Sequence, residues 1–223
     1  SPWNATMKWC LLYGDDETVH ITELLELLRS EDNSNEESTS AVHISVLGSN
    51  TTILKYLIDY NLPLNAIDGD GATPLHWACS NGNKQAMQML LQYGADYQRL
   101  DFDGNNILHY AVEQGRYKIT KRIVSLNILN LEEQNNDGQT VLQIACKNEE
   151  KQIIKFLLNQ GASILRPLIK AIKKNKQHKI VEFLLKNGNL QLASFYGIKK
   201  NPLHIAVEFN RYKMSKLLLE YYP

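Results

Sequence analysis

Three histidines recur at a fixed interval along this chain of 223 residues. His43, His76 and His109 are separated from one another in steps of 33 residues. Histidine is a common metal ligand and proton carrier in proteins, so these rings could do chemistry if they met at one point. A metal site also needs closely spaced partners such as CxxC or HxxxH pairs, and the sequence contains neither. The interval instead indicates a repeat period, with each histidine confined to its own repeat, and we expect no metal and no cofactor.

The three cysteines make no better case for catalysis. Thiol chemistry needs a cysteine beside a base and an oxyanion donor, but Cys79 and Cys146 occupy one position two repeats apart on an expected core face, and Cys10 lies among apolar residues. Three thiols this far apart also exclude a disulfide framework. We predict no catalytic residues, no enzymatic activity, and an intracellular location in the cytoplasm or nucleus, where thiols stay reduced. No segment approaches the ~18 apolar residues of a membrane-spanning helix.

Signals for a turn and a helix start surround the middle histidine. Residues 70–78 read Asp-Gly-Ala-Thr-Pro-Leu-His-Trp-Ala. Asp-Gly predicts a tight turn, Thr73 a helix cap, Pro74 a first helical turn and Gly94 the end of a second helix. This motif resembles the ankyrin repeat family, whose unit of ~33 residues joins a β-turn finger to two helices. The resemblance implies an all-α ankyrin-repeat solenoid of stacked helix-turn-helix units with β-turn fingers.

Copies of the motif cover nearly the whole chain. Residues 103–111 and 137–145 repeat it, with Gln143 in the histidine position of the second, and residues 201–206 repeat it again. Another copy has Ile169 in the histidine position and only five residues between Gly161 and Pro167, too few for a full finger. We expect this copy to interrupt the row of fingers, so that a partner does not span all the repeats.

The expected organisation has seven parts. They are a capping helix pair (about 4–13 and 19–28) with an acidic loop at 1–40, a degenerate repeat at 41–69, repeats at 70–102, 103–136 and 137–164, a repeat lacking a full finger at 165–200, and a C-terminal repeat at 201–223. End units of such stacks are often atypical because they have one neighbour. The chain begins with Ser1 rather than Met, so we expect it to be part of a longer protein.

Charge is unevenly distributed although the formal net charge is zero. Residues 1–40 carry nine acids and two basic residues, whereas residues 165–223 carry twelve basic residues and three acids. An acidic end and a basic end could steer partners. Most charge bias of this kind is nonetheless solvated surface.

The resemblance also implies where a partner binds, because ankyrin repeats recognise other proteins with their finger tips and inner helices. Trp77 and Tyr110 occupy the same position in adjacent repeats, and Phe102 stands on a finger, so we expect three large rings along one groove. The candidate partner-binding residues are Asp70, Trp77, Ser80, Asn81, Phe102, Asp103, Asn105, Tyr110, Glu113, Gln114, Asp137, Gln139 and Lys147.

The aromatic residues and the acids on the fingers also have purely structural explanations. Trp77 and Tyr110 could simply pack against each other, and turn chemistry accounts for most of the finger acids. Those acids are Asp68, Asp70, Asp101, Asp103 and Asp137. Taken together, aromatic rings and acids favour a partner protein or peptide that carries Lys or Arg beside an apolar residue, bound by a monomeric interaction module.

Two further functions stay open on the sequence. The stack could serve only as a spacer or autoinhibitory arm of an enzyme, a channel or a bacterial effector. Alternatively, the basic C-terminal repeats could bind nucleic acid or anionic lipid through charge. We do not expect nucleic acid to be the ligand, because the lysine-rich stretch 170–179 has no interleaved aromatic residue on which bases could stack.

Overall fold

The computed structural model describes residues 39–48, 51–174, 178–188 and 201–221. Within these ranges the secondary structure is helical and contains no strand. The chain divides into two compact units. Unit 1 comprises Ser1–Leu129 with Gln134–Gly138, and unit 2 comprises Asn130–Glu133 with Gln139–Pro223. The expected N-terminal helix pair, Cys10 and most of the acidic loop lie outside the described residues.

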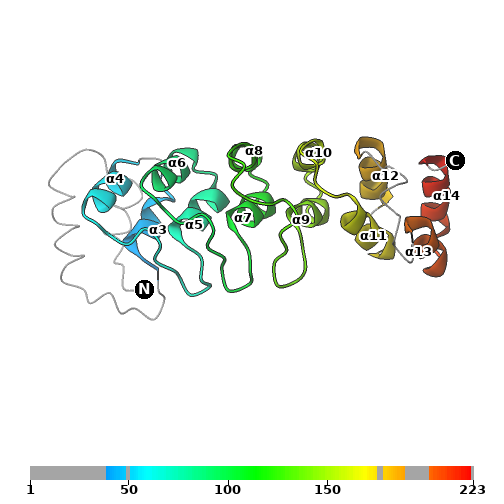
Figure 1. Ribbon diagram of the computed structural model, residues 1–223, viewed down its shortest axis with the longest axis horizontal. Coiled ribbons are helices and arrows are strands. Elements are labelled where there is room, and N and C mark those ends of the chain that lie inside the picture. Colours follow the sequence, from blue (N-terminus) through cyan, green and yellow to red (C-terminus); the bar gives the residue numbers. More distant parts are fainter. Residues whose placement is uncertain (1–38, 49–50, 175–177, 189–200, 222–223) are drawn as a thin grey trace. The chain divides into compact units, whose positions relative to one another are not determined.

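Unit 1 is built from pairs of helices. The pairs are α3 (Ala41–Ser45) with α4 (Thr52–Asp59), α5 (Pro74–Asn81) with α6 (Lys84–Gln92), and α7 (Ile107–Glu113) with α8 (Tyr117–Ser125). The first helix of each pair packs on the next, α3 on α5 and α5 on α7, and Figure 1 shows these helices as one row with α4, α6 and α8 as a second row above it. We call the first helices inner helices, and the turns before α5 and α7 fingers.

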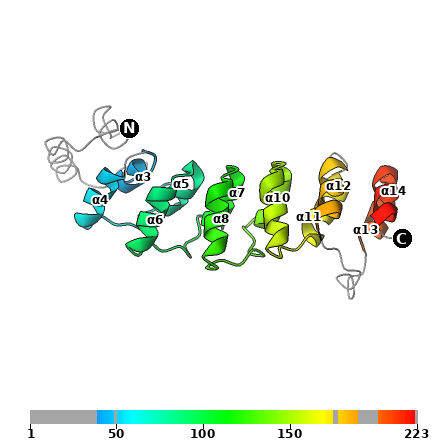
Figure 2. The same cartoon turned by 90° about the horizontal axis from the view of Figure 1, so that it is seen from above.

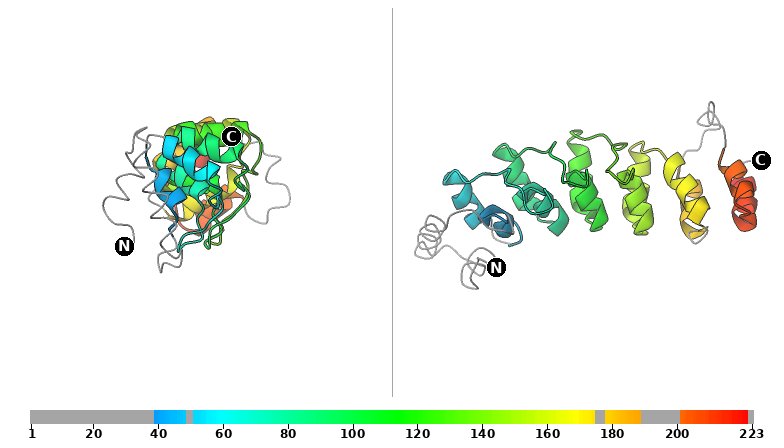
Figure 3. Two further views of the ribbon diagram at one scale, coloured as in Figure 1. Left: turned by 90° about the vertical axis from the view of Figure 1, so that its left-hand side faces the viewer. Right: turned by 90° about the horizontal axis from the view of Figure 1, so that it is seen from below.

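Unit 2 repeats the pairing with one departure. Its pairs are α9 (Val141–Lys147) with α10 (Lys151–Asn159), α11 (Leu165–Lys174) with α12 (His178–Asn187), and α13 (Pro202–Glu208) with α14 (Tyr212–Tyr221). Inner helix α11 contacts both α9 and α13, and Figures 2 and 3 show the two helices of each pair lying beside each other. The departure is that α11 begins at Leu165, directly after the turn that ends α10, with no finger before it.

A capping box starts each inner helix from α3 to α9. Ser40, Thr73, Asn106 and Thr140 are the N-caps, and the residue three positions on returns a hydrogen bond to the N-cap backbone N–H. In the first three helices the acceptor is the histidine Nδ1, at 3.2–3.4 Å, and in α9 it is the Oε1 of Gln143, at 2.9 Å. The histidine period is therefore the period of helix N-termini, where backbone N–H groups lack intrahelical partners.

The second helix of each pair, which we call the outer helix, is amphipathic. This explains why each pair needs neighbours. In α6 the buried residues are Ala86, Met87 and Leu90, and in α10 they are Ile153, Ile154 and Leu157, at the same spacing. This i, i+1, i+4 pattern places an apolar stripe on one helix face. A single pair cannot bury such a stripe alone, so stability comes from stacking.

Outer helices α4, α6, α8 and α10 end in the same way. The residue that reverses the chain adopts a positive φ, and it is Asn61, Gly94, Asn127 and Gly161, respectively. Asparagine and glycine tolerate this left-handed conformation better than other residues. The expected role of Gly94 as a helix terminator is confirmed.

Candidate protein-interaction surface

Each finger of unit 1 closes around a buried aspartate. Asp68 accepts hydrogen bonds through Oδ1 from the backbone N–H groups of Asp70 (3.0 Å) and Ala72 (2.8 Å). In the next finger, Asp101 accepts from the backbone N–H of Asn105 at 2.7 Å and from its side-chain Nδ2 at 3.0 Å. Both aspartates are only 8% exposed. For Asp68 and Asp101, turn chemistry therefore accounts for the acid, as the sequence indicates.

The same two carboxylates hold the aromatic residues of the inner helices. The indole Nε1–H of Trp77 donates to Oδ2 of Asp68 at 2.7 Å, and the hydroxyl of Tyr110 donates to Oδ2 of Asp101 at 2.9 Å. Hydrogen bonds to an ionised acceptor are stronger than neutral ones. Each ring is therefore fixed in orientation against its own finger. We call these the two aromatic clasps.

Each clasped ring also packs on the histidine of the preceding repeat. Trp77 meets His43 edge to face with ring centroids 5.2 Å apart, and Tyr110 meets His76 at 4.9 Å. These ring contacts join each aromatic residue to the preceding repeat. Both aromatic side chains remain half-buried, so part of each ring faces solvent.

Burial sets the protonation of these groups. It lowers the pKa of His43 and His76, against smaller raising effects of nearby backbone and aspartates. A neutral imidazole can accept at Nδ1 from the N-cap while its Nε2–H donates, as His43 does to the carbonyl oxygen of Ala72 on the next finger at 3.0 Å. The pKa of Tyr110 is raised by burial and by its hydrogen bond to Asp101, so the phenol keeps its proton.

Neighbouring fingers are joined by backbone hydrogen bonds. The N–H of Phe102 donates to the carbonyl of Asp70 at 2.9 Å, and the N–H of Asn136 donates to the carbonyl of Asp103 at 2.8 Å. The Phe102 ring lies directly over Gly71, where a Cβ would come within 2.7 Å of it. With 65% of its surface exposed, Phe102 presents an aromatic ring to solvent beside two exposed acids, Asp70 and Asp103.

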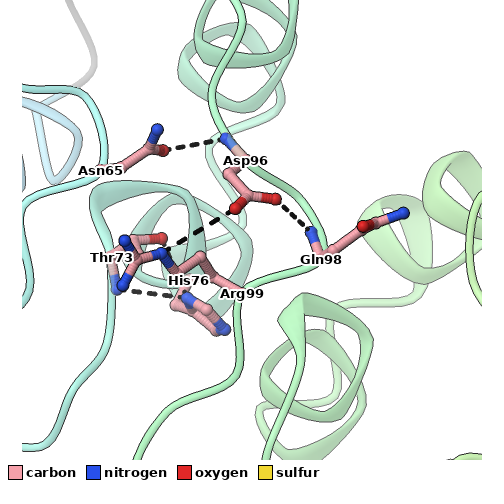
Figure 4. A network of polar contacts seen from close by, with 6 residues as sticks. All are labelled: Asn65, Thr73, His76, Asp96, Gln98 and Arg99. Atoms are coloured by element: carbon pink, nitrogen blue, oxygen red, sulfur yellow. Dashed lines mark hydrogen bonds and ion pairs between the residues drawn. The ribbon is translucent and has the colours of Figure 1, made fainter.

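The loops that lead from the outer helices α4 and α6 to the fingers carry a further polar network, drawn in Figure 4 next to Thr73 and His76 at the start of α5. The backbone N–H of Asp96 donates to Oδ1 of Asn65, 31 residues earlier, at 2.9 Å. The carboxylate of Asp96 in turn accepts from the N–H of Gln98 at 2.9 Å and lies 3.9 Å from the Arg99 guanidinium. The bond between Asp96 and Asn65 links successive repeats.

The candidate residues divide between the two units. Unit 1 holds all of them except Gln139 and Lys147, which belong to unit 2. Some make contacts within the stack: Asn81 donates to the carbonyl of Leu47 at 3.2 Å, and Asn105 accepts from Nδ2 of Asn135 at 2.9 Å. The side chains of Asp70, Asn81, Phe102, Asp103, Glu113, Gln114, Asp137 and Lys147 are exposed, and those of Trp77, Ser80, Asn105, Tyr110 and Gln139 are half-buried.

Sequence reasoning missed the positioning role of Asp68 and Asp101. The signal was present as a spacing of nine residues from each aspartate to the aromatic residue it holds. In the following repeat both members change together, to Asn135 and Ile144. Ile144 is buried and has no polar atom to place, so a carboxylate is no longer required there.

The described residues contain no group of three or more histidine, cysteine, aspartate or glutamate residues arranged to hold a metal ion. None of the helices described is both long enough and apolar enough to cross a membrane. The thiols of Cys79 and Cys146 are buried, and burial raises the pKa of both, that of Cys146 to about 12, which keeps them protonated and unreactive.

Comparisons with known proteins agree with this architecture. A family model described as ankyrin repeats (3 copies) matches residues 10–101 and 97–167. No curated protein sequence matches significantly. Among solved structures, the ankyrin repeat domain of Bcl-3, described as a unique member of the IkappaB protein family, is 25% identical with a TM-score of 0.69. The match covers 84% of this chain and 88% of the Bcl-3 chain. The human ASB11 ankyrin repeat domain is 22% identical with a TM-score of 0.70, covering 99% and 98%.

Proposed function

The chain belongs to the ankyrin repeat family, and from this we propose that unit 1 binds a segment of a partner protein on its finger side. Ankyrin repeats are in general protein–protein interaction modules, and their fold is typically non-catalytic. The proposed surface, which we call the finger face, consists of Asp70, Trp77, Phe102, Asp103 and Tyr110. Both solved relatives are described as domains of their proteins, which supports a role for this stack as the recognition part of a larger protein.

The observation that carries the proposal is the pair of aromatic clasps beside an exposed Phe102. Binding to flexible side chains orders them, and the loss of their conformational entropy reduces the affinity. Trp77 and Tyr110 are already ordered, because each donates a hydrogen bond of 2.7–2.9 Å to a buried carboxylate. Their polar atoms are used inside the stack, so a partner meets ring surface rather than hydrogen-bond donors. Partly exposed, rigid aromatic rings are typical anchors of protein interfaces.

Charge defines the partner further. Asp70 and Asp103 are exposed on consecutive fingers, and Phe102 lies on the second finger next to Asp103. Asp68 and Asp101 add buried negative charge behind them. The favoured ligand is an extended segment with an apolar side chain against Phe102 and an arginine or lysine beside it, in contact with the acids. Arginine suits such a site because its planar group pairs with carboxylates and also stacks on aromatic rings.

Peptide display against the purified chain tests this proposal. We expect selected peptides to be enriched in arginine or lysine next to an apolar residue. A selected peptide should lose at least about tenfold in affinity, or about 1.4 kcal/mol, on Phe102→Ala. Charge reversal by Asp70→Lys or Asp103→Lys should weaken it mainly at low salt, because exposed charges are screened.

Matched controls exist in the same unit. Tyr93 is an exposed aromatic residue and Asp59 an exposed acid, and both lie in or after the outer helices. Tyr93→Ala and Asp59→Lys should leave the affinity within about twofold. If these controls weaken binding as much as the finger-face variants do, or if the selected peptides are acidic, the proposed surface is wrong.

A further inference from the structure

The absent finger of unit 2 leaves an opening between inner helices α9 and α11. In unit 1 the finger before α5 covers the start of α3, where the carbonyl oxygen of Ala72 accepts from Nε2 of His43. No finger follows α9, because α11 begins at Leu165 only a few residues after α10 ends. Gln143, which occupies the histidine position of α9, therefore borders a cavity of about 80 Å³ instead.

Three lysines line this opening. Lys147 comes from α9, and Lys170 and Lys174 lie one turn apart on α11, whose apolar residues Pro167 and Ala171 also line the cavity. None of the lining residues is acidic. In the described part of the chain none of the three lysines forms an ion pair. We call this site the lysine groove.

Neighbouring residues add to the positive charge. The Arg211 guanidinium, from the turn before α14, donates to the backbone carbonyl of Lys173 on α11 at 3.0 Å, and the Lys173 ammonium lies 5.6 Å from the centre of the Phe209 ring. These contacts tie α13 and α14 to the side of α11. The positively charged side chains are therefore held near one another by packed helices. Because like charges repel, an anion bound among them would be stabilising.

We propose that the lysine groove binds an acidic segment of a protein, with a glutamate or aspartate carboxylate placed among Lys147, Lys170 and Lys174. The site is distinct from the finger face of unit 1 and does not depend on it. Gln143 contributes an amide that can donate to the carboxylate, since its Oε1 is already used as acceptor for the Thr140 N–H at 2.9 Å.

A protein segment fits the groove better than a nucleic acid. The groove is a short, concave site with about one helical turn between Lys170 and Lys174, not a track along which phosphates could run. Its lining contains no aromatic ring on which a base could stack.

Binding of a fluorescein-labelled hexaglutamate peptide to the complete chain tests the proposal, followed by fluorescence anisotropy. We expect saturable binding that weakens steeply between about 0.05 M and 0.5 M salt, and no binding of a hexaglutamine peptide. Lys170→Glu with Lys174→Glu should lower the affinity at least about tenfold. The control pair Lys151→Glu with Lys155→Glu makes the same charge change at the same i, i+4 spacing on outer helix α10 and should change it less than about twofold.

A single isosteric change provides the second test. Gln143→Glu keeps the acceptor for Thr140 and hence the capping box, because glutamate is favoured at this position, but it places a negative charge in the groove. The fold should be unaffected, as judged by circular dichroism, while peptide affinity falls several-fold. This variant decides the matter if the double reversal fails to fold.

Other outcomes would overturn the proposal. Absence of hexaglutamate binding, an equal loss in the α10 control, or unchanged affinity in Gln143→Glu would each exclude the groove as the site. A polyuridine oligonucleotide or phosphatidylserine vesicles that bind more tightly than the peptide, with the same sensitivity to Lys170 and Lys174, would show that the ligand is not an acidic protein segment.

Discussion

Removal of the aromatic clasp in the second finger of unit 1 should cost stability in a strongly non-additive way. Asp101 accepts three hydrogen bonds, from the backbone and side chain of Asn105 and from the hydroxyl of Tyr110. A hydrogen bond to a charged group contributes about 1.5–3 kcal/mol. Tyr110→Phe removes one of the three bonds and should lower the free energy of unfolding by about 1.5 kcal/mol. Asp101→Ala removes all three and should lower it by about 4.5 kcal/mol.

The double variant separates the clasp from the rest of the finger. Because Tyr110 has no acceptor once Asp101 is removed, Asp101→Ala with Tyr110→Phe should cost about as much as Asp101→Ala alone. The coupling energy between the two residues is then about 1.5 kcal/mol, well above the ~0.5 kcal/mol that independent sites show. Urea unfolding followed by circular dichroism measures it, with unchanged m-values as the condition for comparison. A coupling energy below about 0.5 kcal/mol would refute the clasp.

Three other outcomes follow from the geometry. Burial lowers the folded-state pKa of His76 below 6.5, so the unfolded chain binds more protons and stability should fall as pH drops below about 6.5. The melting temperature, measured from about pH 7.5 to 5.5, should show this fall. His76→Gln, which copies Gln143 in α9, should make the pH dependence of the melting temperature shallower. Gly71→Ala should destabilise the fold by at least about 1 kcal/mol, since Gly71 has a φ of +81° and the Phe102 ring occupies the space of a Cβ; an unchanged urea midpoint would contradict the finger geometry. Cys146, with its raised pKa, should resist a thiol reagent at pH 8 until the protein is unfolded, and rapid labelling of the native protein would show that its burial is wrong.

Local motifs were sufficient to predict the fold. The 33-residue step of the histidines marks helix N-termini, and Thr73 and Pro74 start α5 where expected. These signals are readable because a cap, its turn and its helix lie within a few residues of one another. Pro167 is the third residue of α11, which begins at Leu165. Proline is tolerated anywhere in a first turn because the N–H groups there lack intrahelical acceptors.

The candidate site was less predictable because it depends on how fingers fold back. Asp68 was recognised as a turn residue, but its second oxygen reaches the indole of Trp77, and a spacing of nine residues carries no general rule. The missing finger before α11 was predicted from the short interval after Gly161. That this gap would gather lysines from two different helices could be seen only once α9 and α11 were placed together.

The central claim is that the finger face of unit 1 binds a protein segment, and an NMR titration tests it most directly. Isotope-labelled protein would be titrated with a peptide selected by display, and the shifted backbone amides would be mapped. We predict that the largest shifts fall on Phe102, Asp103 and Tyr110, together with the indole N–H of Trp77. Shifts confined to outer helices α4, α6 and α8, with the Trp77 indole unmoved, would contradict the account.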